Sequence, residues 1–263
     1  MNITLFKLLA TPIFIGTATL AGRRWGPVVN GLIVGLPLTT GPISFILASQ
    51  YGPAFATQAA AGNLAGQVSM CMFCLSYSLV ARKRSWPVSA VLAIAAYLAT
   101  TVLLDRFTWS LLPAFAVLIL AVALVARVIP HSSEKHVATA APKWDLPARI
   151  GIATAFVILL TSFARYLGPQ LSGLISTFPI FGVIFAAFTH FQQGPEAASN
   201  LLRGIVLGSV SYAFFFLSVG VCLIPFGVAA TYTIALGAVL LVSGSAYFLT
   251  QRGLKQGSDG PHA

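Results

Sequence analysis

Long apolar segments separated by short basic loops dominate this sequence, and they restrict it to folds that expose much of their surface to lipid. Charged residues make up 8% of the 263 residues, against about 25% in a typical soluble domain. So few charges cannot cover the surface of a soluble protein of this size, and the mean hydropathy is +0.90. We therefore predict an all-α membrane protein.

Nine segments have the roughly 20 mostly apolar residues that a membrane-spanning helix needs. They cover residues 3–21, 28–49, 54–81, 87–104, 109–128, 149–164, 170–191, 199–221 and 229–250. The first segment lacks the charged start and the cleavage site of a signal peptide, so we interpret it as a retained span. The most polar linker is 129–148, which is expected to join two halves of the chain.

The basic residues fall mainly in alternate loops. With nine spans, Arg23 and Arg24, residues 82–84, the basic residues of 127–149, and Arg252 with Lys255 all lie on one side. The positive-inside rule makes that side cytoplasmic, so we predict an external N-terminus and a cytoplasmic C-terminus. The same placement explains the net charge of +10 without a nucleic-acid partner.

Two stretches of the chain match each other, without a gap, at an offset of 142 residues. GPVVNGLIVGLPLTTG begins at Gly26, and GPQLSGLISTFPIFG begins at Gly168. Further along, Gly52-Pro53 matches Gly194-Pro195, and the glycine pair 62 and 66 matches the pair 204 and 208. Matches of Gly and Pro are harder to attribute to composition than matches of apolar residues.

The span count makes this duplication an inverted one. Each unit contains four spans, and the span 109–128 connects them. Because five spans separate the starts of the units, the second unit enters the membrane from the opposite side, as in many secondary transporters. We predict a first four-helix repeat over 1–104, a connecting helix and cytoplasmic linker over 105–148, an inverted repeat over 149–252 and a disordered tail over 253–263.

The segment LSGLISTFPIFGVIFAAFTHFQQGPEAASNLLRGIVLGSVSYAFFFLS (171–218) resembles the GlpM-type family of small bacterial inner-membrane proteins. Those are four-span chains of about half this length, so this chain would be a fused duplication. The resemblance covers 149 to about 250 and departs from the pattern in the first half, where Pro42 adds a second proline. It implies an inner-membrane location and an association with alginate production, and no catalytic residues.

Proline interrupts the second span of each unit, and these points are the candidate substrate site. Pro37 and Pro179 each lack a backbone donor and free a carbonyl, and in lipid such groups need partners from the protein or from a cavity. Transporter sites lie at broken helices of this kind; a kinked packing helix is the alternative. Short hydroxyls surround the prolines, and all are candidates: Thr39, Thr40, Ser44, Ser176 and Thr177.

Five polar residues in or near other spans are further candidates. Gln58, Asn63 and Gln67 carry amides that are costly against lipid, and His190 ends a span. Arg203 suits an anionic group, although its side chain can also extend to the cytoplasmic surface. No metal, cofactor or catalytic residue is predicted, because the pair Cys71 and Cys74 lies inside a span without a nearby histidine.

These features favour a secondary transporter or flippase that alternates access between the two units. Its cargo would be a small polar or anionic solute or a lipid-linked intermediate, and direct use of ATP is not expected without a P-loop. The alternative is a non-transporting scaffold of an envelope polysaccharide or lipid biosynthesis complex. An enzyme is disfavoured, since the sequence has no nucleophile motif. The expected partners are membrane lipids and the unknown substrate, and a homo-oligomer is possible.

Overall fold

Helices make up the regular structure in the described part of the computed structural model, which covers residues 13, 16–37, 40–129, 144–152, 154–155 and 178–256. The all-α prediction is confirmed for these residues. Helical residues 16–25 precede the first bounded helix, and residues 145–152 are also helical. The bounded helices are α2 (Pro27–Val34), α3 (Thr40–Tyr51), α4 (Pro53–Ala81), α5 (Trp86–Leu104), α6 (Leu111–Val128), α8 (Ile180–Gln193) and α9 (Pro195–Gln256).

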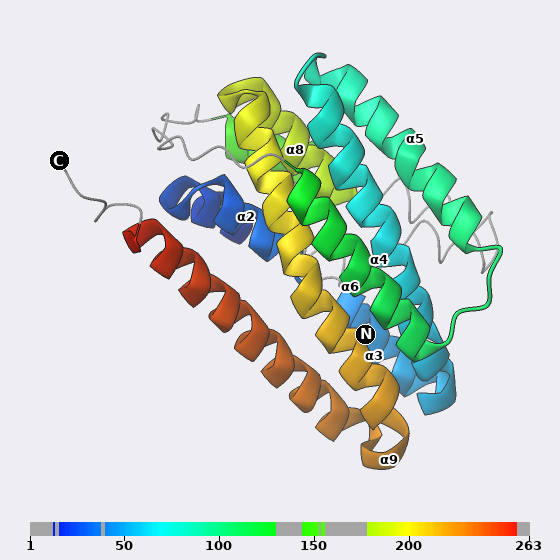
Figure 1. Ribbon diagram of the computed structural model, residues 1–263. Coiled ribbons are helices and arrows are strands. Elements are labelled where there is room, and N and C mark those ends of the chain that lie inside the picture. The colour runs from blue at the N-terminus through cyan, green and yellow to red at the C-terminus, as the bar shows by residue number, and fades with distance from the viewer. Residues whose placement is uncertain are drawn as a thin grey trace.

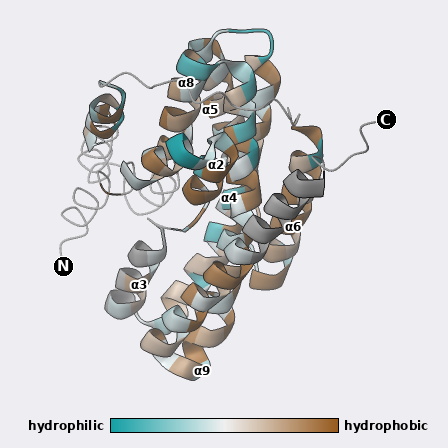
Figure 2. Ribbon diagram, turned by 90° about the vertical axis from the view of Figure 1, so that its left-hand side faces the viewer, coloured by the Kyte–Doolittle hydropathy of each residue, from teal (hydrophilic) through white to brown (hydrophobic). Residues whose placement is uncertain are grey.

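Four of these helices are long and apolar enough to cross a membrane, fewer than the nine segments that the sequence indicates. They are α4, α5, α6 and the Pro195–Gly244 part of α9. Large apolar side chains cover their outer faces; Leu240 and Leu241, for example, are 73% and 77% exposed. Figure 2 shows these hydrophobic helices below a hydrophilic loop at the top of the molecule. Such a surface suits lipid, and the chain is a membrane protein with transmembrane helices.

The predicted span 28–49 is two short helices instead of one. α2 ends at Val34, α3 begins at Thr40, and Pro37 is buried in the bend between them. The Pro37 carbonyl accepts a hydrogen bond from the Gly41 amide at 2.8 Å. At the equivalent place in the second half, Pro179 stands just before α8, and its carbonyl accepts from Val183, also at 2.8 Å. The predicted interruption at both prolines is thus a helix boundary.

The predicted spans 199–221 and 229–250 form the two arms of α9. Gly227 has φ 73° and ψ 177°, a conformation that is open mainly to glycine, and Pro225 precedes it. The chain reverses direction there, as Figure 1 shows at the bottom of the molecule. We call residues 195–226 the first arm and residues 228–256 the second arm.

α4 and the first arm of α9 pack against each other in the centre and run in opposite directions. α3 joins α4 at the bottom of Figure 1, whereas α8 joins α9 at the top. Both helices carry large, fully buried side chains, among them Phe73 and Tyr77 of α4 and Phe215 and Phe216 of the first arm.

Glycines bring α2 into direct backbone contact with the first arm. A Cβ added at Gly204 would lie 2.9 Å from Gly31 Cα, and one at Gly208 would lie 3.0 Å from Gly35 Cα. Small residues permit such close approach between membrane helices. Gly204 and Gly208 are therefore the positions at which the first arm packs on α2. Their equivalents differ: Gly62 of α4 is exposed, with nothing within 4 Å of an added Cβ.

Candidate functional site

A cavity of about 80 Å³ lies where α2 ends and α8 begins. This volume is several times the roughly 10–15 Å³ that a cavity needs in order to hold one water molecule. It is lined by the end of α2, the first residue of α3, the middle of α4, the start of α8 and one residue of the first arm: residues 34–36, Thr40, Gln67, Met70, residues 178–182 and Tyr212. The ends of three short helices therefore meet at one partly open pocket.

Three pairs of residues related by the 142-residue offset line this cavity. Leu36 and Phe178 are 142 residues apart, as are Thr40 and Gly182, and Met70 and Tyr212, and all six line the space. The side chains of Gln67 and Ser209, which also differ by 142, are hydrogen-bonded to each other, with Nε2 donating to Oγ at 2.9 Å. Residues related by the 142-residue offset thus lie close together at this cavity.

Neutral hydrogen-bonding groups supply the polar part of the cavity wall. The Tyr212 hydroxyl donates to Asn63 Oδ1 at 3.2 Å, and Asn63 Nδ2 donates to the Ala59 carbonyl at 2.9 Å. The Thr40 Oγ1 atom is buried near the Tyr212 hydroxyl without a hydrogen bond of regular geometry. Of the lining residues that the structure describes, none carries a formal charge.

The structure brings together part of the predicted site. Thr40, Gln67 and Pro179 line the cavity, Asn63 joins it through Tyr212, and Pro37 is buried next to the lining residue Leu36. Thr39, Ser176 and Thr177 lie outside the described residues.

Four predicted residues lie elsewhere. Ser44 is one turn further along α3, and its hydroxyl is 2.7 Å from that of Tyr232. Gln58 is exposed on the first turns of α4. The His190 ring is in the last turn of α8, where its Nδ1 lies 3.4 Å from the Tyr77 hydroxyl. Arg203 donates to the carbonyl of Ile129 at 3.0 Å and so satisfies the end of α6, where carbonyls lack helical partners.

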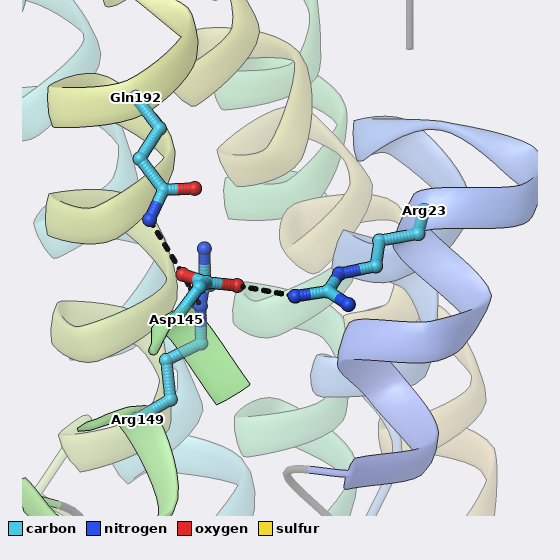
Figure 3. Close-up of polar contacts among 4 residues, drawn as sticks. All are labelled: Arg23, Asp145, Arg149 and Gln192. Carbon is cyan, nitrogen blue, oxygen red and sulfur yellow. Dashed lines mark hydrogen bonds and ion pairs between the residues drawn. The ribbon is translucent and has the colours of Figure 1, made fainter. Parts of the chain in front are cut away.

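A buried ion cluster forms the second candidate feature, at the end of α8 remote from the cavity (Figure 3). The Asp145 side chain is 1% exposed and lies between two arginines: Arg149 Nε donates to Oδ1 at 2.8 Å, and an Arg23 terminal nitrogen donates to Oδ2 at 3.0 Å. The Gln192 side-chain amide also donates to Oδ1. Residues far apart in the chain thus converge on one carboxylate.

Arg149 is held more firmly than Arg23. Its side chain is 4% exposed and stacks on two rings of α8, with its guanidinium carbon 4.8 Å from the Phe188 centroid and 5.4 Å from that of Phe185. The Arg23 side chain is 39% exposed. Burial alone raises the pKa of Asp145, but its hydrogen bonds and charge attraction to Arg149, with the bonds from Gln192 and Arg23, outweigh burial and lower the pKa below its usual range.

The sequence interpretation missed this cluster, because it assigned Asp145 to a polar linker and treated Arg23 and Arg149 as topology signals. One local signal existed. The chain has only five acidic residues, and Asp145 lies four residues before Arg149, the spacing at which opposite charges pair on a helix. Nothing local connects Asp145 to Arg23 or Gln192.

Comparisons with known proteins do not add to this picture. No protein-family model, curated protein or solved structure matches the chain. Its function must be inferred from the cavity and the ion cluster themselves.

Proposed function

We propose that the protein is a secondary transporter of a small polar solute, which alternates access to the cavity between two inverted four-helix units. The cavity carries this proposal. It lies where short helices end, and sites of membrane transporters are typically found where helices are interrupted and their polar ends line an internal space. We place the protein in the bacterial inner membrane, in line with the GlpM-type resemblance of 171–218 and with the basic loops on one side.

Equivalent backbone geometry in the two halves supports the inverted repeat. Gly52 has φ 87° and ψ 167°, and Gly194 has φ 91° and ψ 174°; each is followed by a proline that begins a long helix. The second helix of the following pair begins at Trp86 in one half and after Gly227 in the other, close to the same offset. The opposed directions of α4 and the first arm fit an inversion, and nine spans follow if each half contains four.

The wall chemistry favours an uncharged polar solute. Thr40, Gln67 and Tyr212 offer hydrogen bonds, and the remaining wall is mainly apolar or aromatic. A bare ion here would lose its hydration without a described counter-charge, which is expensive in an apolar interior. Arg203, the basis for expecting an anion, is engaged with the Ile129 carbonyl. The small volume also favours a free solute over a lipid-linked one.

Uptake into proteoliposomes tests the proposal. A panel of small neutral polar solutes, with inorganic anions and cations beside it, is offered to purified protein in sealed vesicles. We expect uptake of at least one neutral solute, and at least a tenfold loss in a variant that combines Gln67→Leu with Tyr212→Phe, because both remove groups that hydrogen-bond at the cavity.

Gln58→Leu is the matched control, because it removes an exposed amide from the same helix. Equal uptake by the wild type, the control and the double variant would contradict the proposed site. If no solute moves and the double variant folds normally, the transport proposal fails and the non-transporting scaffold becomes the better hypothesis.

A further inference from the structure

The ion cluster lies at the far ends of the same elements whose near ends line the cavity. Ile180 and Gly182, in the first turn of α8, line the cavity, whereas Gln192, in its last turn, contacts Asp145. At 1.5 Å per residue, these two points on α8 are about 15 Å apart. On the other side, α2 ends at the cavity, and Arg23 belongs to the helical residues that lead into α2 through Gly26.

The cluster also joins the two units. Arg23 belongs to the first unit and Gln192 to the second, and Asp145 and Arg149 lie where the linker meets the second unit. Figure 3 shows the Arg23 side chain reaching across from its own helix to the carboxylate. A separation of α2 from α8 at this end would therefore have to break the contact between Arg23 and Asp145.

The contacts within the cluster differ in how readily they can open. Asp145 and Arg149 are four residues apart in one helical segment, and both are almost fully buried, so they move together. Arg23 approaches from another segment and is partly in contact with solvent. When Arg23 leaves, it is hydrated, and Asp145 retains both Arg149 and Gln192. The buried carboxylate is never left without a partner, which avoids the main cost of opening a buried ion pair.

We propose that the Arg23–Asp145 ion pair is the latch that closes the cavity toward the side of the molecule that carries the 82–84 loop. Arg149 and Gln192 position the carboxylate and stay with it in both states. The latch rests on the proposed function, since it assigns one of the two gates that alternating access requires. Loss of the latch shifts the population toward the state that is open on this side.

Accessibility of a cysteine in the cavity tests the latch without requiring transport. Thr40→Cys is introduced together with Cys222→Ala; the remaining thiols, Cys71 and Cys74, are buried. A membrane-impermeant methanethiosulfonate is added to vesicles from either side, and the same background without T40C gives the labelling of the native thiols. We expect Arg23→Gln to raise the rate of T40C labelling from the 82–84 side about fivefold, as for a partly exposed ion pair worth about 1 kcal/mol, with no increase from the other side.

Arg24→Gln is the matched control, because it removes the same charge one residue away, from an arginine that stacks on Trp25 outside the cluster. Arg23→Lys keeps the charge but not the planar fork and should give an intermediate rate. Equal rates for R23Q, R24Q and the parent would overturn the latch, as would an increase from both sides. Faster labelling of R23Q in a protein that moves no solute would support the latch and reject the transport proposal. Unchanged labelling of R23Q in a protein with active uptake would reject the latch and support the transport proposal.

Discussion

The α3–α4 turn and the α8–α9 turn lie at opposite ends of the molecule and have nearly the same backbone (Figure 1). Gly52 and Gly194 agree within a few degrees in φ and ψ, and each donates the last hydrogen bond of the preceding helix: the Gly52 amide donates to the Ala48 carbonyl at 3.1 Å and the Gly194 amide to the His190 carbonyl at 3.0 Å. The side chains around the two turns differ. Near the second, Gln192 contacts a carboxylate held by two arginines.

Near the first turn, the described residues make neutral contacts between the units. The Ser44 hydroxyl meets that of Tyr232, and the Phe45 ring lies edge-on to the Tyr232 ring at 5.2 Å. The residues that match Glu196 and Arg203 in the first half are Ala54 and Ala61. The comparison teaches that the two turns share one backbone conformation, whereas the side-chain contacts described beside them are ionic at one turn and neutral at the other. In our proposal these are two gates of different chemistry.

The largest expected effect is a loss of stability when the carboxylate of the ion cluster, which lies at one end only, is neutralised. Asp145→Asn keeps the shape of the side chain but leaves the buried Arg149 without a counter-ion, which we expect to destabilise the protein by about 3–5 kcal/mol. Thermal unfolding and the monodisperse fraction in detergent would measure it. Glu196→Gln is the control, because Glu196 is exposed at the same end. Similar stability of D145N and E196Q would show that the cluster does not stabilise the fold.

The next effect is a difference in stability between substitutions at two equivalent glycines, Gly62 and Gly204. Each lies ten residues after the glycine of its turn, Gly52 or Gly194. Gly204→Ala places a methyl group against the backbone of Val28 and Gly31, which cannot move like a side chain, so we expect a loss of about 3 kcal/mol. Gly62→Ala meets open space and should change stability little. Unfolding temperatures of the two single variants give the comparison. Equal losses would mean that α2 does not pack on the first arm as the structure has it.

A smaller effect tests the backbone that the turns share. Both Gly52 and Gly194 occupy a region with φ near 90° that residues with a Cβ rarely adopt. Gly52→Ala and Gly194→Ala should therefore each lower the free energy of unfolding by about 2 kcal/mol, and the two losses should be similar. Hydrogen exchange at the two turns, together with overall unfolding temperatures, would measure this. A large cost at only one turn would show that the two backbones are not equivalent in solution.

The smallest effect is a pH dependence confined to the ionic end. Because the pKa of Asp145 is lower in the folded protein than its ordinary value of 3.8, the cluster contributes its full stabilisation above that value and loses it as the pH falls toward the folded-state pKa. The difference in unfolding temperature between the wild type and D145N should therefore be constant near neutral pH and shrink below about pH 4. A difference that is the same at pH 3 and pH 7 would contradict the assignment.

Much of the cavity could be predicted from the sequence, because the cavity depends on places where prolines interrupt the helices. Pro37 and Pro179 lack amide hydrogens and fall in the middle of long apolar segments, where a proline kinks or breaks a helix. The hydroxyl and amide residues Thr40 and Gln67 are conspicuous in apolar surroundings. Tyr212 was not singled out. An aromatic residue in a span is usually a packing residue, and its contact with Asn63 depends on how α4 meets the first arm.

The sequence by itself determined the membrane class, the helical content, the glycine turns and the proline breaks, because each follows from local composition or from one residue's backbone limits. Only the tertiary structure decided which polar groups meet. Helices α4 and α9 are far apart in sequence, and their opposed packing sets Gln67 against Ser209. Gln192 reaches Asp145 because the helical residues 145–152 pack beside α8. The sequence shows that Asp145 is a charged residue near a loop, but the residues that pair with it depend on distances in space. Asp145 has three partners only when α8 and the helix before α2 are in place.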